Sequence, residues 1–82
     1  MRANITDNVY SPERVLFLEI IRQAIDDITR SRIESVTYAK AHWFLIESRD
    51  YFYDICLWAG LSPELVREEA QYRIAKRNIV ID

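Results

Sequence analysis

The sequence predicts a single all-α domain, residues 1–82, with four helices and a helix-turn-helix-like corner. Apolar residues recur at helical spacings of three and four along most of the chain. Two Ser-Pro-Glu segments, residues 11–13 and 62–64, carry the residue types that begin helices. The single glycine, Gly60, stands between two helical patterns, where a left-handed residue would close the first helix.

The first helix is expected to begin at Pro12, with Ser11 as its N-cap. Residues 1–9 show no helical period and are expected to form an N-terminal arm. Tyr10 is placed to pack on Val15 as a hydrophobic staple. The apolar stripe of this helix continues to about residue 29 and contains Leu18, Ile21, Ile25 and Ile28.

The second helix is expected to run from about residue 32 to about residue 47. Ser31 followed by Glu34 fits a capping box at its start. Because no glycine or proline separates the first two patterns, a single long kinked helix is the alternative.

The third and fourth helices flank Gly60. Ser48 is expected to cap a helix from about residue 49 to 59, with an inward stripe of Phe52, Ile55, Cys56 and Ala59. The last helix is expected to run from residue 63 to about 77 and to bury Val66, Ala70 and Ile74. The β-branched residues in 78–82 favour an extended tail that docks, pairs with a partner chain or frays.

Composition limits the possible functions. The 82 residues carry 11 basic and 13 acidic side chains, a net charge of −2, whereas proteins that grip phosphates more often have a basic excess. One cysteine excludes an internal disulfide framework and fits a reducing cytoplasm. No apolar run approaches the length of a membrane span. We therefore expect a cytoplasmic protein without a membrane partner.

Catalytic and metal chemistry are not expected from this chain. His42 is the single histidine, and with only Cys56 beside it the usual zinc ligand sets cannot be assembled. Cys56 lies on the predicted inward stripe and is interpreted as a small core residue. One glycine cannot build a phosphate-binding loop. We expect no enzyme activity, no cofactor and no metal site.

The corner around Gly60 can be compared with the DNA-binding helix-turn-helix. Cys56 falls four residues before Gly60, where a small residue is usual, and Leu61 and Val66 fall on apolar positions, although Glu69 does not. Arg and Gln side chains suit guanine and adenine edges. The predicted contacts to duplex DNA are therefore Ser62, Arg67, Gln71, Arg73, Lys76 and Arg77. The alternative is a solvated helix face with pairs such as Glu69 to Arg73.

A second hypothesis is a small interaction module that acts as an adaptor or inhibitor of a host protein. Eight of the eleven residues from 49 to 59 are apolar, more than one small core accommodates. Tyr51, Tyr53 and Trp58 are the predicted partner-interface residues, because Tyr and Trp are frequent interface anchors. They would serve a homodimer, a partner protein or, alternatively, only the core.

Residues 39–67 also carry a resemblance. The segments that carry it are Ala41-His42-Trp43-Phe44, Ser48-Arg49-Asp50, Phe52, Ile55-Cys56, Ala59-Gly60-Leu61-Ser62-Pro63 and Val66-Arg67. This pattern resembles small, mostly uncharacterised proteins encoded in bacteriophage and prophage genomes. The resemblance implies a helix-turn-helix-like domain and a role in phage gene regulation. It carries no catalytic motif.

Overall fold

The computed structural model describes the backbone of residues 11–80 and the side chains of residues 11–77. This part of the chain is an all-α domain with four α-helices and one π-helical turn: α2 (Pro12–Arg30), α3 (Val36–His42), η1 (Trp43–Glu47), α4 (Asp50–Ala59) and α5 (Pro63–Val80). The predicted fold class is confirmed. The predicted arm and the Tyr10 staple lie outside the described residues.

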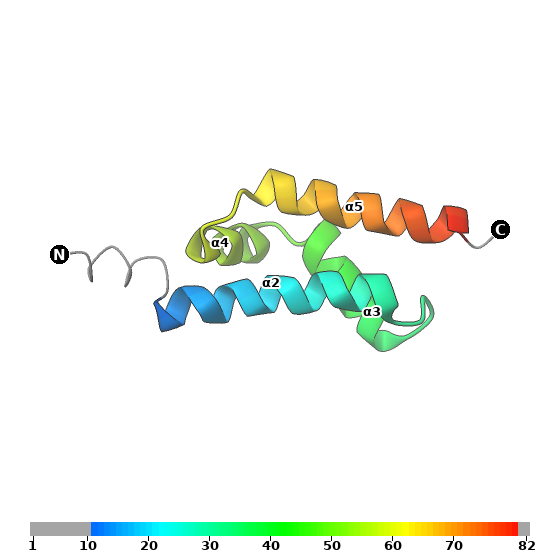
Figure 1. The fold of residues 1–82 in the computed structure, drawn as a ribbon, viewed down its shortest axis with the longest axis horizontal. Coiled ribbons are helices and arrows are strands. Elements are labelled where there is room, and N and C mark those ends of the chain that lie inside the picture. The colour runs from blue at the N-terminus through cyan, green and yellow to red at the C-terminus, as the bar shows by residue number, and fades with distance from the viewer. Residues whose placement is uncertain (1–10, 81–82) are drawn as a thin grey trace.

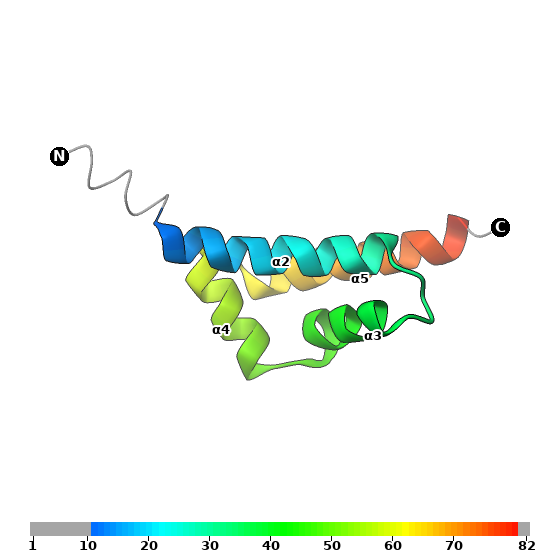
Figure 2. The same cartoon turned by 90° about the horizontal axis from the view of Figure 1, so that it is seen from below.

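The two long helices, α2 and α5, run side by side in the same direction (Figure 1). The chain returns between them through α3, η1 and α4, which lie along one side of the pair (Figure 2). Helix α2 packs against α3, η1, α4 and α5, so every other element of the described fold contacts it. The first and second helical patterns are separate helices, not one kinked helix.

The predicted helix starts at Pro12 and Pro63 are confirmed. The hydroxyl of Ser11 accepts a hydrogen bond from the backbone N–H of Arg14 at 3.2 Å. The hydroxyl of Ser62 accepts one from the N–H of Leu65 at 3.3 Å. These side chains satisfy backbone donors that have no partner within the first helical turn.

The left-handed position at Gly60 is also confirmed, with φ of 81°. The N–H of Gly60 donates to the carbonyl of Leu57 at 3.0 Å, and the N–H of Leu61 donates to that of Cys56 at 2.8 Å. This pair of bonds closes α4 by the Schellman arrangement, in which glycine takes the left-handed place at little steric cost.

Two predicted N-caps are wrong. Ser31 ends α2, where its N–H donates to the carbonyl of Asp27, and α3 instead begins after Ser35, whose hydroxyl accepts from the N–H of Tyr38 at 3.1 Å. Glu34 pairs with Arg32 and so is not part of a capping box. Ser48 closes η1, and α4 begins after Arg49 without a side-chain cap.

The predicted extended conformation of the tail is wrong for residues 78–80, which continue α5. Adding a residue to an existing helix requires no new nucleus, and this outweighs the weak local preference of β-branched residues. Residues 81–82 lie outside the described part of the chain.

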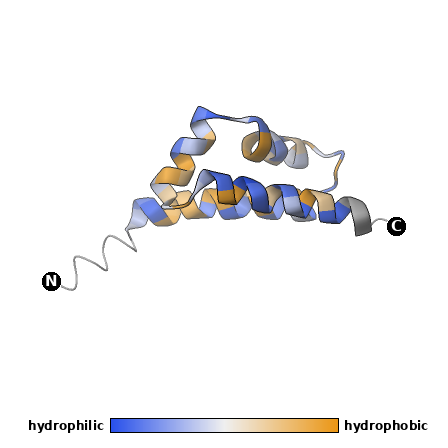
Figure 3. Ribbon diagram, turned by 90° about the horizontal axis from the view of Figure 1, so that it is seen from above, coloured by the Kyte–Doolittle hydropathy of each residue, from blue (hydrophilic) through white to orange (hydrophobic). Residues whose placement is uncertain are grey.

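The core lies where α2, η1 and α4 meet beneath α5. The predicted inward stripe of α4 is confirmed, because Phe52, Ile55, Cys56 and Ala59 are all buried. From α5, Ala70 is buried, and Val66 and Ile74 pack against the core while remaining partly exposed. Hydrophobic and hydrophilic residues alternate along α5 (Figure 3), as expected for a helix that covers a core on one side. No helix within residues 11–80 has a stretch apolar and long enough to cross a bilayer.

Candidate functional site

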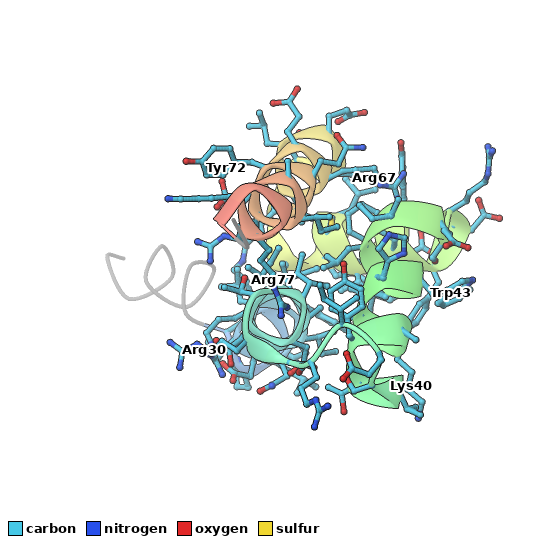
Figure 4. The ribbon with its side chains drawn as sticks, turned by 90° about the vertical axis from the view of Figure 1, so that its right-hand side faces the viewer. Arg30, Lys40, Trp43, Arg67, Tyr72 and Arg77 are labelled. Carbon is cyan, nitrogen blue, oxygen red and sulfur yellow. The ribbon has the colours of Figure 1, made fainter. Side chains whose placement is uncertain are left out.

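The predicted DNA-reading residue Arg67 points into the molecule (Figure 4). Its Nε donates to the carbonyl of Leu45 and its Nη2 to that of Ser48, both at 2.7 Å. Its guanidinium carbon lies 4.5 Å from the centre of the Phe52 ring. This side chain is only partly exposed, because its guanidinium binds a carbonyl of η1 and that of Ser48, which follows η1.

Arg77 also points inward from α5, toward the end of α2 (Figure 4). Its Nη1 donates to the carbonyl of Ile28 at 2.7 Å, one of the acceptors left without a partner in the last turn of α2. Arg73 donates to the carboxylate of Glu69 at 2.6 Å, which confirms the predicted pair. These two arginines therefore make contacts within the domain.

The exposed face of α5 retains two of the predicted DNA contacts, Gln71 and Lys76. Ser62 is exposed as well, but its hydroxyl caps the helix. Two exposed carboxylates, Glu64 and Glu68, share this face. Because carboxylates repel phosphates, the surface of α5 is electrostatically poor for DNA.

The predicted interface residues do not form one patch. Trp58 and Tyr51 lie on the side of α4 that faces α2. The ring centres of Trp58 and Phe17 are 5.1 Å apart, and Trp58 remains 56% exposed. Tyr53 lies on another side of α4, in a polar hollow that it shares with Arg67. The structure thus brings Tyr51 and Trp58 to one face and separates Tyr53 from them.

An apolar groove of about 740 Å³ lies between α2 and the α3–η1 segment. Carbon atoms provide most of its surface. Its apolar lining includes Leu16, Ile20, Ala39, Trp43, Phe44 and Tyr51. Leu16, Trp43 and Tyr51 are each more than half exposed, which is unusual for large apolar side chains that share one hollow.

The π-helical turn shapes one wall of this groove. The N–H of Ser48 donates to the carbonyl of Trp43 at 2.8 Å, a bond that spans five residues. The same spacing brings His42 Nδ1 within 3.4 Å of a Glu47 carboxylate oxygen. Trp43, the first residue of this turn, lines the groove, and Phe44 beside it is buried. Single π-helical turns occur frequently at functional sites.

The two rims of the groove carry opposite charge. On α2 the rim contains Glu19 and Asp27, and on α3 it contains Lys40. Glu19 forms an ion pair with Arg22, whose hydrogen bond lowers the pKa of Glu19. Asp27 accepts a hydrogen bond from the amide of Gln23 at 3.0 Å, and no cation pairs with it among the described side chains. The groove therefore has an acidic rim and a basic rim.

The sequence reasoning missed Leu16, Trp43 and Lys40 as members of a site. Leu16 lies outside the main stripe of its helix, and an apolar residue in such a position is the available signal for a second packing face. Trp43 lies within the predicted second helix, and periodicity alone does not show whether another helix covers it. It shares an exposed face of the α3–η1 segment with Val36 and Ala39, at helical spacings of three and four.

Other chemistries find less support within residues 11–77. Cys56 is buried, and desolvation raises the pKa of its thiol to about 11, so a reactive thiolate is disfavoured. No group of three or more His, Cys, Asp and Glu side chains within the described residues has the arrangement of a metal site.

Comparison of the chain with protein-family models, curated proteins and solved structures finds no match. The candidate site accordingly rests on the geometry of this chain alone.

Proposed function

We propose that this protein is a protein–protein interaction module whose binding site is the groove between α2 and the α3–η1 segment. The observation that carries the proposal is the exposure of Leu16, Trp43 and Tyr51 around one apolar hollow. Folding alone does not account for these residues, because the core is closed without them. Covering them with apolar groups of a partner would remove their surface from water, which is the main driving force of association.

The dimensions of the groove fit side chains of a partner protein. Its volume of about 740 Å³ lies within the range typical of pockets that bind compact apolar groups. An amphipathic helix presents apolar side chains at spacings of three and four along one face and can place them along such a groove. The charged rims would orient the bound segment, because complementary charges set the register of an interface more than its affinity.

Peptide selection tests this proposal without a known partner. Helical peptides from a random display library would be selected on the immobilised protein, and their affinities measured by fluorescence anisotropy at low protein concentration. Ala39 is exposed in the groove, so Ala39→Arg should block it and weaken binding by about tenfold or more.

The matched control is Ala75→Arg, which makes the same change at an exposed alanine of α5. This variant should bind the selected peptides like the parent protein. Equal loss in both variants, or selected peptides that ignore both substitutions, would contradict the groove as the binding site.

Duplex DNA binding is the second candidate function. The support is the succession of α4, the left-handed Gly60 and the capped α5, which is the order of elements in a helix-turn-helix. The remaining accessible contacts are Gln71 and Lys76. A mobility shift at low salt that Lys76→Ala weakens would favour this candidate and the phage-type regulatory role; no shift at low salt would reject it.

A further inference from the structure

We propose that the groove is occupied by a second copy of this chain. The inference rests on the proposed function and names the partner of the same site. In the dimer a two-fold axis runs along the groove, so that α2 of each protomer faces the α3–η1 segment of the other. Because α2 and α3 lie side by side (Figure 2), one two-fold rotation brings the α2 rim of each protomer opposite the α3 rim of the other. Such an interface is self-complementary, since each contact occurs twice.

The charges on the rims carry this inference. The α2 rim carries Asp27 together with Glu19, which is paired with Arg22, and the α3 rim carries Lys40. A two-fold axis along the groove places the acidic rim of one protomer against the basic rim of the other, on both sides. Asp27 and Lys40 have no oppositely charged partner within residues 11–77, so both are available for this contact.

The apolar residues of the groove supply the rest of the interface. Trp43 from the α3–η1 side of one protomer would cover the Leu16 end of α2 in the other. Three side chains from each protomer, all more than half exposed, would together remove roughly 600 Å² of apolar surface from water. Because specific interfaces begin near about 1,200 Å² in total and are somewhat over half apolar, this dimer lies at the lower limit of size. We therefore expect association in roughly the micromolar range.

The outer face of α5 is a poorer surface for self-association. Leu65 and Tyr72 are exposed there, seven residues apart. The carboxylates of Glu64 and Glu68 share the Leu65 end of this face, so two copies that pair through that end would bring like charges together. The groove is the face on which apolar area and complementary charge coincide.

Charge-exchange variants test the arrangement by sedimentation equilibrium. Lys40→Glu makes both rims acidic, and Asp27→Lys removes the unpaired acid of α2 and makes that rim more basic. Each variant alone should dimerise about tenfold more weakly than the parent protein, or worse. An equimolar mixture of the two should form a heterodimer of near-parental affinity, because each groove then meets its complement.

The control for net charge is Lys76→Glu, which makes the same substitution as Lys40→Glu on α5 and should leave the dimer unchanged. Circular dichroism would establish that each variant is folded. The proposal is overturned if the mixture stays as weak as its components, if Lys76→Glu weakens the dimer as much as Lys40→Glu, or if the parent protein is monomeric throughout the micromolar range. Peptides that bind the groove of a strictly monomeric protein would leave the proposed function standing and reject only the second copy.

Discussion

Replacing Arg67 with methionine should destabilise the domain more than any other single arginine replacement within residues 11–77. Methionine keeps an apolar stem of similar length over Phe52 but removes the donors to the carbonyls of Leu45 and Ser48. A hydrogen bond from a charged group contributes about 1.5 kcal/mol or more, so the loss of two should cost about 3 kcal/mol. In a domain of this size that corresponds to a decrease of roughly 15 °C in Tm.

Urea denaturation followed by tryptophan fluorescence would measure the free energy of unfolding. Two further Arg→Met variants provide a graded series. Arg77→Met removes one carbonyl contact, to Ile28, and should cost about half as much. Arg22→Met removes only a surface pair with Glu19 and should leave the free energy of unfolding nearly unchanged. If all three variants had the same stability as the parent protein, the structural role of Arg67 would be refuted.

Three further predictions concern local structure. Ser35→Ala should reduce the free energy of unfolding by about 1 kcal/mol in urea titrations, because it removes the cap of α3. Ser31→Ala should have little effect. A larger loss in Ser31→Ala than in Ser35→Ala would restore the rejected capping box. Gly60→Ala should lower Tm through a cost of about 1–2 kcal/mol, because alanine is strained at positive φ and its Cβ would displace the guanidinium of Arg14; an unchanged Tm would argue against the left-handed turn. Burial raises the pKa of Cys56 above its value in the unfolded chain, so this thiol favours folding below about pH 9 and progressively less as the pH rises toward 11. The stability advantage of the parent protein over Cys56→Ala should therefore shrink over that interval, and a difference independent of pH would contradict a buried, protonated thiol.

The features predicted correctly from the sequence are those that depend on neighbours within about one helical turn. The caps at Ser11 and Ser62, the left-handed Gly60 and the inward stripe of α4 each follow from residue types a few positions apart. The Ser31 cap failed for a related reason. Two serines four residues apart both fit a helix start, and the residue types around them do not decide between the two.

The inward course of Arg67 and Arg77 could not be predicted in this way. Their acceptors are backbone carbonyls that lie 19 to 49 residues away in sequence. Which carbonyls lack partners depends on where η1 and α2 end and on how α5 crosses them, and a residue pattern contains neither fact. An arginine on a helix that covers the ends of other helices can therefore face solvent or bind their free carbonyls, and only the tertiary structure distinguishes these two roles.

The groove escaped prediction because it depends on how α2 and α3 pack against each other. Periodicity places apolar residues on a face of one helix, but it does not show whether the facing helix covers them. Tyr51 and Trp58, for which the sequence leaves both an interface and the core open, are exposed, whereas Tyr53 lies on another side of α4.

The emission of Trp43 tests the groove as a binding surface most directly. In a Trp58→Phe variant this residue is the only tryptophan, and it is half exposed in the groove. Its emission should shift to shorter wavelength as protein concentration rises through the micromolar range, or when a selected peptide binds, because the indole leaves water. The added substitution Ala39→Arg should abolish the shift. Emission that stays constant at all concentrations and with every bound peptide would contradict the assignment of this groove as the site of interaction.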